Sequence, residues 1–423
     1  MKRFLIFLFL TITPIISSAG IIDASFGADL EGAYYNIDKG YNDNNSEDSV
    51  SVYRANLRLN NYFSSYFLLD LQYVFARNSL AKLDKEKYIQ KFHQANVLIG
   101  EDNINLKLGR MHYNEREGGD YLIYYGTHSI TYSPFITNLD GGELNAKFKI
   151  FTLNGVYGID ENEYYDETKT DAKISGLKLG INIKEQIKLN TYLFTKKDKT
   201  THYQKEIKTP GIELEYNGNK NNFITSYTLS KGTRTSTLNT KDYDGDAVFI
   251  KYSRLEEGSL FDTKLRLLYA KGSGENADTS TVLEKFEPIN PYLELGEIFL
   301  NRDSLKNFGY LRQVSTTYGL QANSLANLKV ENIGVDISTK FIKGFTFSLD
   351  IFNFNVVEPL SYITPSTELG QELNASLKYF YKDLCLKLFY AKFEDGEASK
   401  AVYSPNIGST IQKSGLTVTY NFN

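Results

Sequence analysis

The chain of 423 residues contains no tryptophan, two methionines and one cysteine, Cys385. A single cysteine excludes an intramolecular disulfide framework. After the first sixteen residues, no apolar run approaches the ~20 residues that a membrane-spanning helix requires, which excludes a transporter built from helices. The net charge of −4 gives no basic excess of the kind that binds nucleic acid.

Chemistry-bearing residues are also few. None of the four histidines lies in a recognisable nucleophile motif: His93, His112, His128 and His202. Simple alternation along its segment places His93 on a lipid-facing register, near the outer rim. Asp242, Asp244 and Asp246 are spaced like part of a calcium loop but lack its full signature, so a solvated acidic loop is expected. We therefore expect no enzyme activity, no catalytic residue, no bound metal and no cofactor.

The N-terminus has the three parts of a secretory signal. Lys2 and Arg3 precede the apolar run Phe4–Ile16, and small residues follow up to Ala19. The alternative, a single anchoring helix, requires a longer apolar run. The pattern predicts a signal peptide at residues 1–19 and export of residues 20–423 as a single domain.

Alternation with a period of two residues dominates the rest of the chain. In the segment 49–60, Tyr53 and Leu57 alternate with Arg54 and Arg58. Such alternation indicates a strand with one apolar and one wet face. More than a dozen segments of this kind follow one another, each nine to thirteen residues long. A tilted strand of ~9–11 residues crosses a bilayer.

The connections between these segments alternate between short and long. The expected short connections lie at Asn60–Phe63, Glu101–Asp102, Phe148–Phe151, Glu185, Asn217–Lys220, Leu255–Gly258, Phe341–Lys343 and Asp383. The expected long ones are Ile37–Asp48, His112–Asp140, Asp160–Asp171, Lys197–Lys208, Gly232–Tyr243, Lys271–Asn327, Val356–Gly370 and Glu394–Thr410. Short periplasmic turns and longer extracellular loops are typical of outer-membrane barrels.

The sequence therefore predicts an all-β fold, a transmembrane antiparallel β-barrel of about 18 strands in the outer membrane of a Gram-negative bacterium. An even strand number lets the barrel close, which lipid requires because unpaired strand edges cannot persist there. The aromatic content of 14 % suits interfacial girdles. Outer-membrane lipid and lipopolysaccharide are the expected surroundings, and the chain is expected to be a monomer or a homotrimer.

A barrel of this size is too wide for its own side chains to fill. Function is therefore expected at inward-facing positions. The candidate pore-lining or solute-binding residues are Arg54, Arg58, Lys107, Lys178, Lys251, Lys264, Arg266, Lys378, Lys387, Asp70 and Asp350. Lys378 is expected opposite Lys387, and Lys251 opposite Lys264 and Arg266, which would make anion-attracting patches. The alternative is that these cations pair with nearby luminal carboxylates as ordinary wall.

Two long loops contain apolar residues that a wholly solvated loop does not need. In Lys271–Asn327 these are Phe286, Ile289, Tyr292, Leu293, Leu295, Ile298 and Phe299, and in His112–Asp140 they are Tyr121, Leu122, Ile123, Tyr124 and Tyr125. Loops of this length are usually functional or disordered, and the apolar content argues against disorder. Both are expected to fold inward and narrow the pore, or alternatively to pack against a neighbouring loop outside it.

Some segments resemble the alginate-export-type outer-membrane porins. They are the strand Leu106-x-Leu108-Gly109-Arg110, the segment from Phe286-Glu287-Pro288 to Gly296, and the strands from Leu328 to Asn355. The resemblance implies an eighteen-stranded barrel and passive diffusion of a polar or charged solute through an electropositive constriction. The luminal arginines are few here, which speaks against a polyuronate.

The function expected from the sequence is that of a porin, a diffusion channel for small polar or charged solutes, with anions preferred. A ligand-gated, energy-coupled transporter needs a plug domain ahead of its barrel, whereas strand alternation begins here at Asp23. The remaining alternative is a structural or adhesive barrel that does not conduct. An open lumen would favour the porin, and a filled lumen would favour the structural or adhesive barrel.

Overall fold

A computed structural model describes residues 23–38, 48–78, 88–114, 122–125, 137–161, 171–199, 203–236, 239–274, 282–289, 295–299, 309–320, 324–361, 363–402 and 410–422. The expected signal peptide, His128, His202 and the loop residues Tyr121, Tyr292 and Leu293 lie outside these ranges. Within them, no helix has both the length and the apolar character to cross a membrane.

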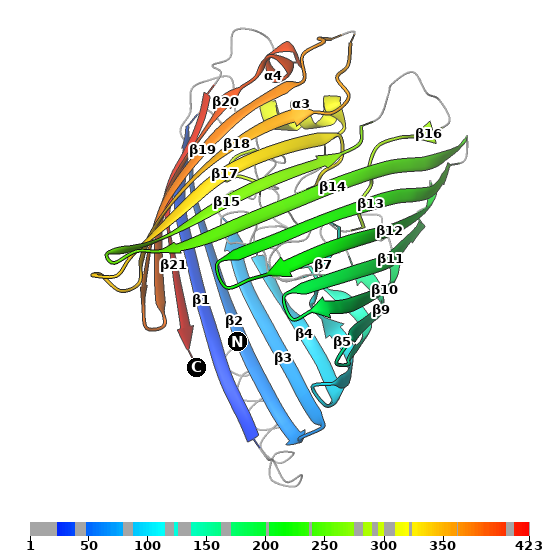
Figure 1. Ribbon diagram of the computed structural model, residues 1–423, viewed down its shortest axis with the longest axis vertical. Coiled ribbons are helices and arrows are strands. Elements are labelled where there is room, and N and C mark those ends of the chain that lie inside the picture. The colour runs from blue at the N-terminus through cyan, green and yellow to red at the C-terminus, as the bar shows by residue number, and fades with distance from the viewer. Residues whose placement is uncertain are drawn as a thin grey trace.

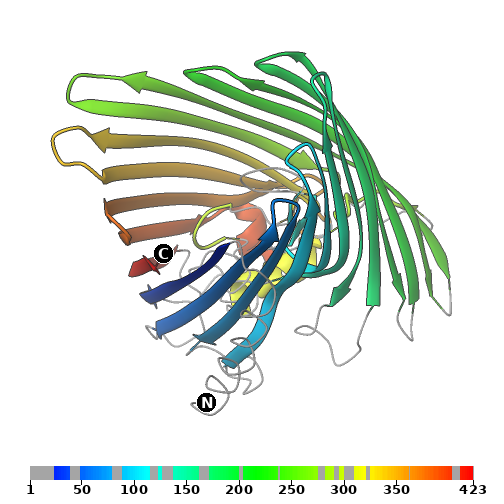
Figure 2. The same ribbon diagram turned by 90° about the horizontal axis from the view of Figure 1, so that it is seen from below.

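The described residues form a closed antiparallel barrel of eighteen strands (Figures 1 and 2). The wall strands are β1 (Asp23–Asp38), β2 (Asp48–Ser64), β3 (Phe67–Asn78), β4 (Tyr88–Gly100), β5 (Ile104–Met111), β8 (Leu139–Lys147), β9 (Phe151–Glu161), β10 (Asp171–Lys184), β11 (Ile187–Lys199), β12 (Tyr203–Asn217), β13 (Asn221–Ser236), β14 (Thr240–Glu257), β15 (Phe261–Gly272), β17 (Leu328–Thr339), β18 (Phe345–Val356), β19 (Glu368–Tyr381), β20 (Leu384–Asp395) and β21 (Thr410–Phe422).

Each wall strand pairs with its neighbours in chain order, and the first strand closes on the last. β1 pairs with β2 on one side and with β21 on the other, from Ala28 opposite Phe422 to Asp38 opposite Gln412. Every backbone ladder therefore has a partner, which removes the open edges of a flat sheet. The predicted fold class is confirmed.

Short elements lie within the long connections. They are β6 (Tyr113–Asn114) paired with β7 (Tyr124–Tyr125), β16 (Val282–Leu283) paired in parallel with β14, α3 (Gly309–Tyr318) and α4 (Glu397–Val402). Tyr318 donates its hydroxyl hydrogen to the carbonyl of Ala398 at 2.9 Å, which ties α3 to α4.

The outward face of the wall is apolar and exposed. Leu177 is 53 % exposed on β10, Leu193 48 % on β11 and Ile212 50 % on β12. Aromatic side chains gather near the short turns: Tyr62, Tyr66, Phe67, Phe148, Phe151, Phe261, Phe341, Phe380 and Tyr381 are all at least 36 % exposed. Exposed apolar patches of this extent mark a surface that another apolar medium covers. A band of aromatic residues near the turns is typical of the girdle at a membrane interface.

The ends of some strands differ from the expectation. The first turn lies at Ser65–Tyr66 and not at Asn60–Phe63, because β2 continues to Ser64, which lies opposite Phe67 at the start of β3. The expected loops Lys197–Lys208 and Gly232–Tyr243 are mostly strand, since β11 runs to Lys199 and β13 to Ser236. Polar side chains that pair across neighbouring strands can extend a sheet beyond its apolar belt.

Candidate functional site

The predicted pore-lining residues lie on the inward face of the wall. On β2, Arg54 is 4 % exposed beside the outward Tyr53 at 58 %, as the period of two requires. Residues that lie opposite each other on paired strands share a face, so the strand registers extend this inward face to other strands. Asp70 lies opposite Asn60, Lys107 opposite Glu143, and Asp350 opposite Gly334. Lys178, Lys251, Lys264, Arg266, Lys378 and Lys387 share this inward face.

Six of the nine predicted cations form ion pairs with carboxylates. The pairs are Arg54–Glu31, Arg58–Asp29, Lys107–Glu143, Lys178–Glu213, Arg266 with both Asp336 and Asp350, and Lys387–Glu297. Arg266 lies 2.9 Å from each of its aspartates. The luminal wall is thus a mosaic of compensated charges, which was the alternative to an anion-attracting patch.

Of the two expected cation patches, the one at Lys378 and Lys387 has the predicted register and the one at Lys251 does not. Lys378 does lie opposite Lys387, on β19 and β20. The expected position of Lys251 is wrong: it lies opposite Leu268, whereas Arg266 lies opposite Ser253 and Lys264 opposite Leu255. The β14–β15 turn comes after Glu257, a little later than expected, and this shifts the register of the whole hairpin.

The described part of the loop Lys271–Asn327 enters the barrel. We call residues 282–289 and 295–299 the luminal strap. Its first part is attached to the inward face of β11, β12 and β13: Lys205 lies 2.5 Å from Glu287, Lys196 donates to the carbonyl of Ile289 at 3.0 Å, and Ser230 donates to the carbonyl of Glu287 at 3.0 Å.

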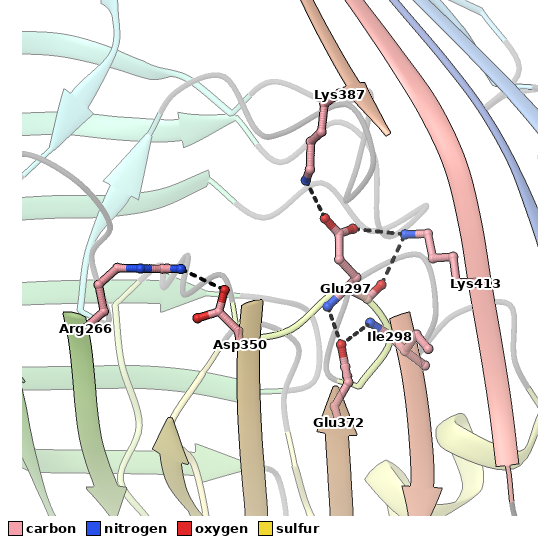
Figure 3. Close-up of polar contacts among 7 residues, drawn as sticks. All are labelled: Arg266, Glu297, Ile298, Asp350, Glu372, Lys387 and Lys413. Carbon is pink, nitrogen blue, oxygen red and sulfur yellow. Dashed lines mark hydrogen bonds and ion pairs between the residues drawn. The ribbon is translucent and has the colours of Figure 1, made fainter. Parts of the chain in front are cut away.

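The second part of the strap is attached through the carboxylate of Glu372 on β19. This carboxylate accepts the backbone N–H of Glu297 at 2.5 Å and of Ile298 at 3.1 Å (Figure 3), and also that of Phe299 at 2.8 Å. Three successive N–H groups around one anion form a concave anion-binding turn. Glu372 is 1 % exposed, so little water competes for these bonds.

Gly296 makes this turn sterically feasible. Its φ of +87° is in the left-handed region that favours glycine. A Cβ at this position would lie 2.6 Å from a carboxylate oxygen of Glu372. Any other residue would therefore push the strap away from the carboxylate that holds it.

Glu297 adds a second attachment to β20 and β21. Its carboxylate lies 2.8 Å from Lys387 and 3.4 Å from Lys413, and Lys413 also donates to the Glu297 carbonyl at 3.1 Å (Figure 3). Burial alone opposes ionisation of this carboxyl, but the two lysines outweigh it and lower its pKa to about 2. The Lys413 ammonium also lies 4.7 Å from the centre of the Tyr35 ring, a cation–π contact.

The two attachments are on separate sectors of the barrel. Along the described wall, four strands separate β13 from β19 in one direction, and eight separate β21 from β11 in the other. Both described parts of the strap lie inside the lumen, so the expected inward folding of this loop is what the structure has. Phe299 stacks on Phe393 with ring centres 4.8 Å apart, which packs the far end against the wall.

The second loop also lies inside. Leu122, Ile123 and Tyr125 are fully buried, and the carbonyl of Leu122 accepts the backbone N–H of Ile289 in the strap at 3.1 Å. Tyr113, which pairs with Tyr125, donates its hydroxyl hydrogen to the inward-facing Asn154 at 2.8 Å. The two loops therefore form one core that narrows the lumen.

His93 contradicts the sequence prediction. It is 0 % exposed and faces inward, where its Nε2 lies 2.7 Å from Asn56 Oδ1 and its Nδ1 lies 3.0 Å from His112 Nε2. A β-bulge is the cause: Gln72 pairs with Gln94 and Tyr73 with Phe92, so His93 is an extra residue that reverses the alternation. Because the amide oxygen accepts a hydrogen from Nε2, neutral His93 accepts at Nδ1 from His112.

No group of three or more side chains that could ligate a metal ion occurs in the described ranges. Asp242, Asp244 and Asp246 project from β14 at its exposed end and not from a loop. What the luminal arrangement can do is present paired charges along a narrowed passage.

Sequence reasoning did not find Glu297, Lys413, Glu287, Lys196 or Lys205. One signal was available: Glu297 lies within the apolar segment Leu295–Phe299, where a charged residue needs a buried partner. The partners could not be named, because Lys413 lies 116 residues away along the chain.

Comparison with known proteins gives a fold and no sequence relative. No family model matches the chain, and no curated protein matches it. Among solved structures, OccAB2 of Acinetobacter baumannii matches with a TM-score of 0.63 at 13 % identity, over 96 % of this chain and 99 % of that one. OpdQ of Pseudomonas aeruginosa matches with 0.57 at 15 % identity, over 96 % and 99 %.

The outer membrane protein opdK of Pseudomonas aeruginosa matches with a TM-score of 0.59 at 12 % identity, over 95 % of this chain and 99 % of that one. These matches do not support the finer resemblance to alginate-export-type porins. They extend over nearly the whole of both chains, so this chain shares the eighteen-stranded barrel fold with these bacterial proteins.

Proposed function

We propose that this protein is a passive diffusion channel of the Gram-negative outer membrane for small polar or charged solutes. The observation that carries the proposal is the strap: it lies inside a barrel with an apolar exterior and a charged interior, and ion pairs fix its two described parts to separate sectors of the wall. A fixed constriction lined with charge selects solutes by size and electrostatics. The shared fold with an outer membrane protein supports the location.

The charges of the passage refine the expected preference for anions. Arg266 pairs with Asp336 as well as with Asp350, and Lys387 pairs with Glu297 (the pairs with Asp350 and Glu297 are drawn in Figure 3), so these cations produce no local excess of positive charge. The channel accordingly admits polar or charged solutes that interact in passing with the ion pairs of the wall. Its selectivity between anions and cations is weak. Residues 1–19 act as the export signal in this proposal, and no enzyme activity is involved.

The test is single-channel conductance of the refolded protein in a planar bilayer, with the reversal potential under a salt gradient. We expect steady conductance with weak ion selectivity. Arg266→Gln leaves Asp336 and Asp350 without their cation, so the reversal potential should shift toward cation preference. The control is Arg254→Gln on β14, whose side chain is on the outward face beside Glu256 and should leave selectivity unchanged.

A structural or adhesive barrel is the second candidate. It is favoured by the loop core, in which Phe286, Ile289 and Leu295 of the strap are almost fully buried inside the barrel. Correctly folded barrels without conductance would contradict the channel and favour this candidate. Conductance that Arg266→Gln does not alter would remove Arg266 from the passage.

A further inference from the structure

One sector of the outer surface carries two pairs of lysines that face one another across neighbouring strands. The lysines are Lys173 on β10, Lys197 on β11, Lys208 on β12 and Lys231 on β13, which we call the rim lysines. They share the outward face with the apolar Leu177, Leu193, Ile212 and Tyr227. All four are exposed, and the side chain of Lys197 is 61 % exposed.

Strand register brings the rim lysines together in pairs. Lys173 lies directly opposite Lys197, and Lys208 directly opposite Lys231. Residues directly opposite across a pair of strands have Cβ atoms about 5 Å apart, and like charges there destabilise the sheet. Such an arrangement is favourable when an anion lies between the ammonium groups.

The carboxylates nearby compensate only part of this charge. Glu206 lies between the two pairs, 3.3 Å from Lys197 and 3.5 Å from Lys208. Asp244 on β14 pairs with Lys231, and Asp242 and Asp246 lie beside it on the same edge. Among the described side chains of β10–β12, Lys173, Lys197 and Lys208 outnumber Glu206 on this outward face, and three further aspartates lie at the β14 edge.

The height of the rim lysines on the wall also matters. Going down each strand, Lys173 and Lys197 are four residues from the exposed Leu177 and Leu193, and Lys208 and Lys231 are four from Ile212 and Tyr227. The lysines thus lie just above the apolar belt, at the level of lipid headgroups, where their stems can lie on apolar surface. On the far side of the barrel several outward positions at this height are uncharged, among them Asn36, Ser49, Gln371, Gln412 and Ser414.

We propose that the rim lysines bind the phosphates of a glycolipid in the outer leaflet, the diphosphorylated disaccharide of lipid A. Lysine binds phosphate as a point charge, and clustered basic residues beside a membrane recognise anionic headgroups. The inference rests on the proposed outer-membrane location and not on the proposed channel activity. The bound lipid would hold this sector of the wall at a fixed height in the leaflet.

The test uses the full folded barrel in detergent and native mass spectrometry with added diphosphoryl lipid A. The variant Lys173→Gln/Lys197→Gln/Lys208→Gln/Lys231→Gln should bind at least about tenfold more weakly, since each lysine near an anionic headgroup is worth about 1 kcal/mol. Monophosphoryl lipid A should bind more weakly than the diphosphoryl form. The matched control is Lys329→Gln/Lys392→Gln, outward lysines that pair with acids on their own strands.

Three results would overturn the proposal. Equal binding by the quadruple variant would exclude the lysines, and loss of binding only on removal of divalent cations would point to the acidic β14 edge. Equal affinity for phosphatidylglycerol would replace the glycolipid by any anionic lipid. Conductance of the quadruple variant separates this inference from the proposed function, because lipid binding and conductance can each fail alone.

Discussion

At the scale of single residues, side-chain direction follows from alternation except where a bulge intervenes. Arg54 and Arg58 face inward as the period of two predicts, whereas His93 does not, because one extra residue in β4 reverses the alternation. The consequence is a hydrogen-bonded polar chain on the inward face, from Asn56 through the buried His93 to His112.

We expect His93→Ala to lower the free energy of unfolding by about 2 kcal/mol, because Asn56 and His112 lose a buried hydrogen-bond partner. Urea unfolding of the refolded barrel in liposomes measures this change. Phe92→Leu is the control: Phe92 faces outward at 38 % exposure, so a change below about 0.5 kcal/mol is expected. A neutral or stabilising His93→Ala would mean that His93 faces lipid after all.

At the scale of elements, the strap is held by charges and not by a ladder of its own. Glu372 binds three backbone N–H groups, and Glu297 binds two lysines. Breaking a buried ion pair by removing one partner is far more costly than the pair is worth, since the other charge stays buried. The strap should therefore be held firmly while Glu297 is ionised.

Acid should loosen the strap through Glu297. The folded-state pKa of about 2 lies below the ordinary 4.5, so the stabilisation is complete above about pH 4.5 and is lost as pH falls toward 2. The shift corresponds to a contribution on the order of 3 kcal/mol. Single-channel current noise, recorded stepwise from about pH 6 to about pH 2.5, should rise across this window.

Glu297→Gln is the matched variant for this pH series, because it removes the titrating group and keeps the side-chain shape. Its noise should be high at every pH and should not rise across the window. A wild-type channel with constant noise down to the lowest pH would contradict the role of Glu297.

At the scale of the whole molecule, closure depends on the last strand. β21 pairs with β20 on one side and with β1 on the other. Without it, both neighbours expose unpaired N–H and C=O groups, which lipid does not tolerate. The expected monomer or homotrimer stays a prediction.

Deletion of residues 410–423 should abolish the folded barrel. Unheated SDS electrophoresis should show the compact, heat-modifiable band for the full chain and none for the deletion. Removal of residue 423 alone is the control, since β21 ends at Phe422. A compact band from the long deletion would mean that the barrel can close without β21.

The sequence by itself determined the barrel fold, the approximate positions of its turns and the inward orientation of Arg266, Lys378 and Asp350. Period-two alternation and turn residues are local, so they can be read along one strand at a time. The tertiary structure alone decided which charges meet. Glu297 joins residues 90 and 116 positions away, and Glu372 holds a turn 75 positions away. Contacts across a lumen depend on how a long loop closes, and no local pattern encodes that distance.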